Sequence, residues 1–325
     1  SVMRSSHSFH LFSSLALWRR SVSSSDRSYS VFIWAVSAVF LLLSGCGRPH
    51  QPVDKPVLAV SIEPLRYFVE QIAGDRYRVV SVVPVGFSPE TYEPAPEQLL
   101  AVSEAKLYFK VGQLGFETTW LNRICENNPH LLLVDTSDSL DASTGNAHAQ
   151  LLDPHTWTSC RNAEQISRCV CAALCRLDSL GRDTYQERLQ QLVKNIHQTD
   201  RQVRQLLQNL RYRTFVTAHP AYTYFALEYG LKQLSIERNG KEPAPGELAD
   251  FVRQCRQEDV KVILVQPEFN KESARVLAKE MGAEVKDVQP LNYDWHQEML
   301  KVATLLKTAG EQASGVLNSR LDDDK

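Results

Sequence analysis

The segment Asp183–Leu210, DTYQERLQQLVKNIHQTDRQVRQLLQNL, contains no glycine or proline and has one apolar stripe along its whole length. The members of this stripe recur alternately four and three positions apart, which places them on one face of a single α-helix about 40 Å long. The stripe consists of Tyr185, Leu189, Leu192, Ile196, Thr199, Val203, Leu206 and Leu210. Such a stripe is typical of one helix of a coiled-coil dimer, and also of a helix that packs across two folded regions. We favour the second and expect a monomer.

On both sides of this helix, short β-rich runs alternate with helical patterns. The predicted strands are 57–61, 78–83, 106–111 and 131–135 before it, and 214–218, 231–236, 260–265 and 285–288 after it. Such alternation is typical of parallel sheets covered by helices. We therefore predict an α/β protein of two lobes, each with a mainly parallel sheet covered by helices, joined by one long rigid helix.

The first 46 residues differ in composition from the rest of the chain. A basic, Ser-rich stretch precedes the apolar run 31–43, which ends in Leu43-Ser44-Gly45-Cys46. A run of this length is shorter than the ~20 residues that span a bilayer, and its flanks match a secretory signal peptide. The last four residues resemble a bacterial lipobox, in which Cys46 becomes the lipidated first residue. An ordinary signal peptide with an incidental cysteine is the alternative.

Length and composition, together with the patterns above, predict how the chain is divided into parts. The 325 residues, 43% of them hydrophobic, suffice for about two domains, and a net charge of −2 argues against nucleic acid as a partner. We predict an exported lipoprotein, periplasmic or on the outer cell surface, anchored to a membrane. Its parts are a signal peptide with lipobox (1–46), a tether (47–55), an N-terminal α/β lobe (56–182), a linking helix (183–210), a C-terminal α/β lobe (211–317) and a solvated tail (318–325).

Six cysteines follow Cys46. They are Cys125, Cys160, Cys169, Cys171, Cys175 and Cys255. Export permits disulfides, but small buried thiols are an equally good interpretation, and the sequence leaves their pairing open.

Four loops are candidates for the ligand site, because ligands of open α/β sheets bind beyond the carboxyl ends of the strands. These loops are 84–94, 152–158, 218–222 and 288–291, and they offer Glu90, His155, His219 and Gln289. Each side chain alone has an ordinary explanation, such as a solvated glutamate or a histidine bonded to a carbonyl. Together, two imidazoles, a carboxylate and an amide oxygen match a first-row divalent metal.

Beyond single residues, the chain resembles the solute-binding proteins of zinc and manganese ABC importers. The resemblance covers about 57–311 and rests on Ser88–Pro96 (SPETYEPAP), Asp153–Trp157 (DPHTW), His219 before an aromatic-rich helix, and Gln289-Pro290-Leu291. It implies a metal ion held between the lobes by Glu90, His155, His219 and Gln289, two from each lobe. It also implies an importer permease and ATPase as partners, since this chain has no phosphate-binding loop of its own.

Two of these positions depart from the family pattern. Glu90 stands where the family usually has histidine, and Gln289 stands where it usually has aspartate. Exchange of nitrogen for oxygen makes Mn²⁺ or Fe²⁺ plausible, while Zn²⁺ remains our first choice. Asp287 and Glu268 are reserve ligands. The zinc-binding branch often carries a His-rich insert, but the segment 137–152 contains only His148.

Three other functions fit parts of the pattern. A zinc hydrolase would need an open coordination position, but no His-Glu-x-x-His or Gly-x-Ser-x-Gly motif is present. A binding protein for a metal chelate such as haem or cobalamin would need a broad aromatic cleft. A surface adhesin is compatible with metal binding. For the favoured function, we expect metal to draw the lobes slightly together.

Overall fold

The computed structural model describes residues 55–140, 153–237, 244–269 and 271–323, which all lie in one compact unit, Lys55–Lys325. The predicted signal peptide, Cys46 and nearly all of the tether lie outside the described residues, as does His148. Among the helices that are described, none combines the length and apolar character needed to cross a membrane.

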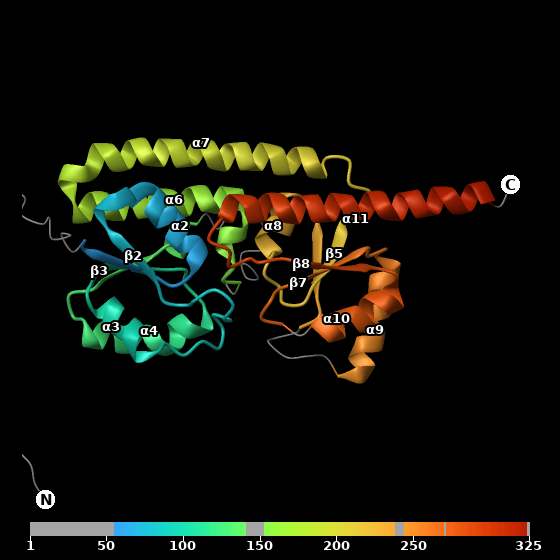
Figure 1. Cartoon of the computed structure of the whole chain (residues 1–325), viewed down its shortest axis with the longest axis horizontal. Coiled ribbons are helices and arrows are strands. Elements are labelled where there is room, and N and C mark those ends of the chain that lie inside the picture. Colours follow the sequence, from blue (N-terminus) through green and yellow to red (C-terminus); the bar gives the residue numbers. More distant parts are fainter. Residues whose placement is uncertain (1–54, 141–152, 238–243, 270, 324–325) are drawn as a thin grey trace, which may run out of the picture. The chain divides into compact units, whose positions relative to one another are not determined.

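The N-terminal lobe is built on a four-stranded parallel sheet (Figure 1). Its elements are β1 (Val57–Val60), α2 (Glu63–Ala73), β2 (Arg78–Ser81), α3 (Pro96–Ser103), β3 (Ala105–Lys110), α4 (Gly115–Asn127) and β4 (Leu132–Asp135). The strands follow the order β2-β1-β3-β4. Figure 1 shows α2 on one face of the sheet and α3 and α4 on the other.

The C-terminal lobe repeats this arrangement. Its elements are β5 (Thr214–Thr217), α8 (Thr223–Glu228), β6 (Lys232–Ser235), α9 (Pro245–Gln257), β7 (Val262–Val265), α10 (Lys271–Met281) and β8 (Glu284–Asp287). All four strands are parallel, in the order β6-β5-β7-β8. Gly282 follows α10 with φ 66°, the left-handed conformation of a glycine C-cap. The predicted fold class of two parallel α/β lobes is confirmed.

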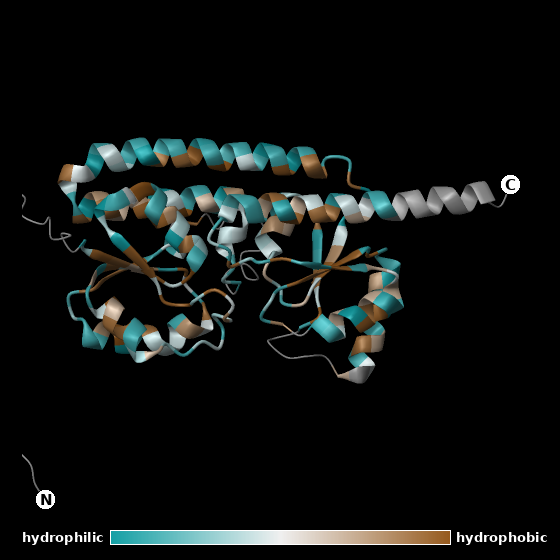
Figure 2. Cartoon of the chain, viewed as in Figure 1, coloured by the Kyte–Doolittle hydropathy of each residue, from teal (hydrophilic) through white to brown (hydrophobic). Residues whose placement is uncertain are grey.

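Three long helices lie beside the two sheets: α6 (Cys160–Leu177), α7 (Arg182–Leu207) and α11 (Trp295–Asp323). Helix α7 is the predicted linking helix, and it packs on α2, α6 and α11. Figure 2 shows its alternation of hydrophobic and hydrophilic residues. Its buried side chains include Tyr185, Leu192, Ile196, Thr199 and Val203. Helix α11 continues to Asp323, through most of the segment expected as a tail, because no proline interrupts it.

Two hydrophobic clusters fill the described part of the chain. One continues from the N-terminal sheet through α6, α7 and α11 to one face of the C-terminal sheet, where it includes Phe215 and Leu264. The other lies on the opposite face, beneath α9 and α10, and includes Val216 and Ile263. The first cluster is therefore shared by both lobes.

A short segment after β8 also connects the lobes; we call residues 288–294 the crossing segment. The indole Nε1 of Trp157 donates to the Pro290 carbonyl at 2.7 Å, and that of Trp295 donates to the Trp157 carbonyl at 2.6 Å. The Tyr293 hydroxyl donates to Oε2 of Glu70 on α2 at 2.6 Å. Together with the shared core, these bonds restrict how far one lobe can move relative to the other.

The six cysteines after residue 46 are all free thiols. The Sγ atoms of Cys171 and Cys175, one turn apart on α6, lie 4.0 Å from each other.

Candidate metal centre

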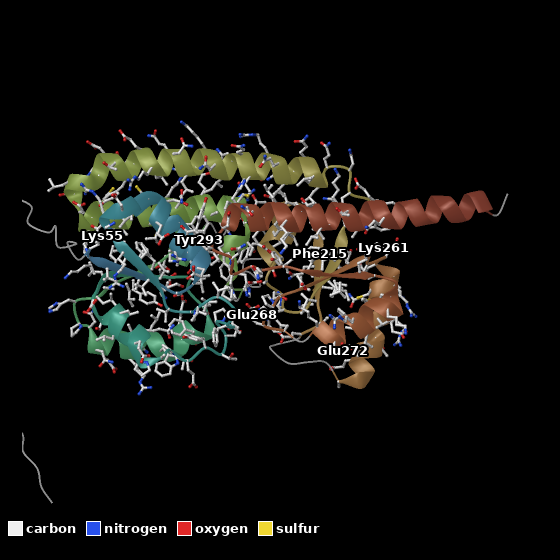
Figure 3. The ribbon with its side chains drawn as sticks, viewed as in Figure 1. Lys55, Phe215, Lys261, Glu268, Glu272 and Tyr293 are labelled. Atoms are coloured by element: carbon white, nitrogen blue, oxygen red, sulfur yellow. The ribbon has the colours of Figure 1, made fainter. Side chains whose placement is uncertain are left out.

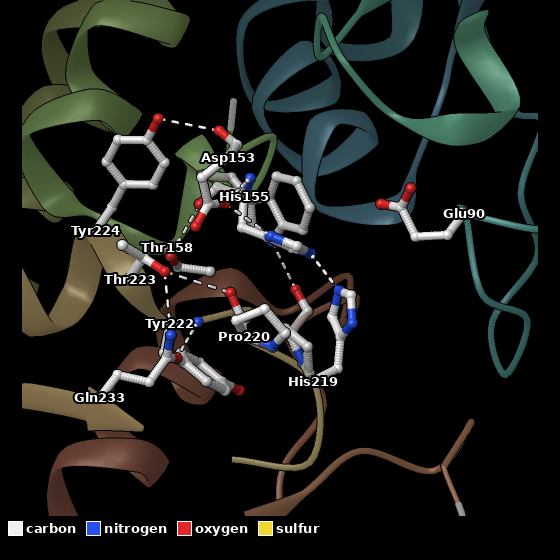
Figure 4. A network of polar contacts seen from close by, with 12 residues as sticks. Glu90, Asp153, His155, Thr158, His219, Pro220, Tyr222, Thr223, Tyr224 and Gln233 are labelled. Carbon is white, nitrogen blue, oxygen red and sulfur yellow. Dashed lines mark hydrogen bonds and ion pairs between the residues drawn. The ribbon is translucent and has the colours of Figure 1, made fainter. Parts of the chain in front are cut away.

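Three of the predicted ligands meet between the lobes. Glu90, His155 and His219 each offer one ligating atom, and these atoms all lie within 4.8 Å of one another. Glu90 belongs to the loop after β2, His155 precedes α6, and His219 follows β5. Figure 4 shows the carboxylate of Glu90 pointing toward the two imidazoles.

The imidazole of His155 is held by the residues around it. Its side chain is buried, and its Nδ1 lies 2.8 Å from Oδ1 of Asp153, which also accepts the main-chain N–H of His155 at 2.9 Å. The Tyr224 hydroxyl of α8 donates to the Asp153 carbonyl at 3.0 Å. Because a carboxylate accepts the proton on Nδ1, the lone pair is on Nε2, which faces Glu90 and His219.

The imidazole of His219 is held in the same way by a carboxylate that follows the neighbouring strand. Its Nδ1 lies 2.8 Å from Oε2 of Glu237, so its Nε2 also carries the free lone pair. The buried Gln266 donates its amide to the His219 carbonyl at 2.8 Å, and Phe269 stacks on the ring at 5.1 Å between centroids. Burial lowers the pKa of His219, and the neighbouring His155 lowers it further.

These hydrogen bonds leave the Nε2 lone pairs of His155 and His219 directed toward each other. The Nε2 atoms of His155 and His219 are 3.2 Å apart. Two neutral imidazoles with both Nδ1 atoms protonated cannot hydrogen-bond through these atoms, so the arrangement calls for a shared cation or proton.

Glu90 adds an anionic oxygen to this pair. Its Oε2 accepts the N–H of Gly115, the first residue of α4, at 3.1 Å, and the positive end of that helix favours the carboxylate. Its Oε1 is buried and has no hydrogen-bond partner among the described residues. The approach requires glycine, since a Cβ at residue 115 would lie 2.3 Å from the Glu90 carbonyl oxygen. The unpartnered oxygen fits a metal ligand.

The cavity around these groups has an empty volume of about 320 Å³, including its mouth. Beside the three predicted ligands, its lining includes Glu268 on the turn after β7 and Phe269. Burial raises the pKa of Glu268, because water is removed from its carboxylate. Gln289 is exposed and does not line the cavity, so the structure does not bring it to the cluster. Asp287 pairs with Lys271 at 2.9 Å.

The site is strongly acidic. Burial would raise the pKa of Asp153, but the hydrogen bond and charge of His155 outweigh this, so the pKa is lowered. Asp153 and Glu237 hold the imidazoles, while Glu90 and Glu268 face the cavity. Four carboxylates around two imidazoles attract a cation and repel an anion.

Comparison with known proteins shows the family to which the chain belongs. The family described as zinc-uptake complex component A, periplasmic, matches residues 58–309. The manganese-binding lipoprotein MntA of Halalkalibacterium halodurans is 26% identical over 262 residues, covering 78% of this chain and 86% of that protein. The high-affinity zinc uptake system protein ZnuA of Bacillus subtilis is 25% identical over 281 residues, covering 80% and 88%. A crystal structure of ZnuA superposes with a TM-score of 0.74 and 33% identity, covering 79% of this chain and all of that one.

Proposed function

The chain belongs to the family of zinc-uptake complex component A proteins, and from this premise we propose that it captures a divalent transition-metal ion between its lobes and delivers it to an ABC importer. The observation that carries the proposal is the pair of Nε2 atoms 3.2 Å apart, each on a ring whose other nitrogen is bonded to a carboxylate. Histidines oriented in this way are typical of metal sites.

We propose Glu90, His155 and His219 as ligands of the ion, which is the cargo of the protein. Imidazole nitrogens and one carboxylate suit Zn²⁺, our first choice, and they also accept Mn²⁺ or Fe²⁺. Among the relatives, one is named for zinc and another for manganese, so the family itself admits both ions.

The spacing of the ligating atoms supports a bare ion as cargo. The ligating atoms of Glu90, His155 and His219 all lie within 4.8 Å of one another, a separation that a single ion can bridge. A haem or cobalamin macrocycle would need a broader space. A hydrolase would also need catalytic groups beside the ion, and the sequence has neither a His-Glu-x-x-His nor a Gly-x-Ser-x-Gly motif.

The sequence supports a proposal for how the protein is anchored and which proteins it works with. We propose that Cys46 carries a lipid anchor, that 47–55 tethers the protein outside the cytoplasm, and that 56–182 and 211–317 are the two lobes around the linking helix. A permease and an ATPase would complete the importer. Because the lobes share a core and the crossing segment, we propose that closure on the ion is small.

Metal titration tests this function. The full chain, stripped with chelator, should bind one equivalent of Zn²⁺, measured by calorimetry and by elemental analysis. His155→Ala and His219→Ala should each lose that equivalent. His197→Ala is the matched control, because this imidazole is exposed on α7 and should leave binding unchanged. Binding that survives both ligand substitutions, or a wild-type chain that binds neither Zn²⁺ nor Mn²⁺, would refute the proposal.

A further inference from the structure

We infer that Glu268, rather than Gln289, supplies the fourth ligand to the captured ion. This inference rests on the proposed function, and it changes the chemistry of the site, because a second carboxylate takes the place of a neutral amide. Figure 3 shows Glu268 between the two lobes.

The backbone around Gln289 directs its side chain away from the site. Val288 and Pro290 are buried on either side of it, whereas Gln289 itself is exposed. The N–H of Gln289 donates to Oε1 of the buried Glu298 at 2.7 Å, and the next carbonyl accepts from Trp157. These bonds fix the backbone of the crossing segment with the Gln289 side chain exposed, whereas Glu268 already lines the cavity.

Glu268 is already at the cavity. It lines the same space as Glu90, His155 and His219, and its side chain is only partly exposed. It belongs to the turn after β7, where parallel strands present their carboxyl ends to a ligand. A carboxylate in this position is one of the ordinary ligands of zinc, manganese and iron.

The turn that carries Glu268 is attached to a ligand on both sides. Gln266 bonds the backbone of His219, and Phe269 stacks on its ring with an interplanar angle of 11°. Glu268 lies between these two contacts, so the distance from its backbone to the ion is restricted. Its oxygens are not part of the group of atoms within 4.8 Å, and we infer that its side chain turns inward when the ion binds.

The donor type favours this assignment. Glu268 adds an anionic oxygen to the two imidazoles and Glu90, and an anionic oxygen attracts a divalent ion more strongly than the neutral amide of Gln289 does. Two carboxylates also provide more oxygen donors, which brings Mn²⁺ and Fe²⁺ closer to Zn²⁺ in affinity than a three-histidine site would.

The test compares three substitutions in the full chain, with Zn²⁺, Mn²⁺ and Co²⁺ as probes. Glu268→Gln removes the charge and keeps the shape. Glu272→Gln is the matched control, since this carboxylate lies four positions further on and is exposed, 71% of its side chain being accessible. Gln289→Ala removes the competing ligand. Affinity is measured by competition with a chelator, and the visible spectrum of bound Co²⁺ reports its coordination.

We expect Glu268→Gln to weaken Zn²⁺ binding at least tenfold, Mn²⁺ binding more, and to alter the Co²⁺ spectrum, while the other two variants match the wild type. Wild-type affinity and spectrum in Glu268→Gln, or an equal loss in Gln289→Ala, would overturn the inference while leaving the proposed function intact. A wild-type chain that binds none of the three ions, or a His155→Ala variant that binds them fully, would overturn both.

Discussion

The Nε2 atoms of His155 and His219 lie 3.2 Å apart, although one residue precedes α6 and the other follows β5 of the opposite lobe. Asp153 and Glu237 fix the two rings from behind. The structure therefore presents two nitrogen donors that already converge. Oxygen ligands would complete the coordination of an ion bound to these nitrogens.

Zinc should stabilise the folded chain. An ion that bridges the lobes binds only the native state, so zinc at one hundred times its dissociation constant should raise the free energy of unfolding by about 2.7 kcal/mol. Thermal unfolding of the stripped chain with and without zinc measures the effect. His155→Ala should show no increase; an equal increase in that variant would place the stabilising ion elsewhere.

Glu237→Gln should weaken zinc binding by about 10–100-fold, because a neutral amide can donate to Nδ1 of His219 as well as accept from it and so no longer enforces the tautomer with its lone pair on Nε2. Chelator competition measures the loss. Glu258→Gln is the control. Glu258 pairs with Lys232, the first residue of β6, whereas Glu237 follows the other end of that strand. If both variants bind zinc equally well, Glu237 does not position the histidine.

Zinc binding should weaken as the pH falls. Burial lowers the pKa of His219 from its usual value of about 6.5, so this ring stays neutral at pH 7 and is ready to bind. Affinity should be nearly constant between pH 7 and 8 and decrease at lower pH, by up to about tenfold per pH unit for each proton that the ion must displace. Dissociation constants measured between pH 5 and 8 test this. An affinity that rises on acidification would contradict it.

Glu90→His should shift selectivity toward zinc. The substitution exchanges an oxygen donor for a nitrogen donor at the same cavity wall, and imidazole favours zinc over manganese. The ratio of the two dissociation constants should change by at least about tenfold. Glu93→His is the control, because Glu93 is an exposed residue of the same loop. An unchanged ratio in Glu90→His would remove Glu90 from the ligand set.

Trp157→Phe should lower the free energy of unfolding by about 1–3 kcal/mol, because the buried Pro290 carbonyl loses its donor. Trp120→Phe, on α4 and only partly buried, should cost less. Chemical denaturation of both variants gives the comparison. Equal stability of the Trp157 variant and the wild type would show that this bond does not hold the lobes together.

Much of this architecture could be predicted from the sequence. The apolar stripe of α7 and the alternation of β-rich and helical runs reflect burial directly, so the two sheets and the linking helix were predictable. His155 and His219 were predictable as neighbours because the motifs place both at the carboxyl ends of parallel strands or on the loops beside them.

The orientation of single side chains could not be predicted. Gln289 and Glu268 both follow strands, and only the structure shows that Glu268 lines the cavity whereas Gln289 is exposed outside it. Glu237 was missed because it follows β6, and the sequence does not reveal that β6 lies next to β5. Once the order of the strands in the sheet is known, an acidic residue after one strand and a histidine after its neighbour indicate that the two side chains can bond to each other.

The crossing segment has a consequence for turnover. A receptor whose halves are joined through Trp157 and a common core loses little conformational entropy on capture, so tight retention is the natural state. Retention of this kind makes spontaneous unloading slow. Release of the ion would therefore require energy to separate the groups that hold it, whereas its recognition would not.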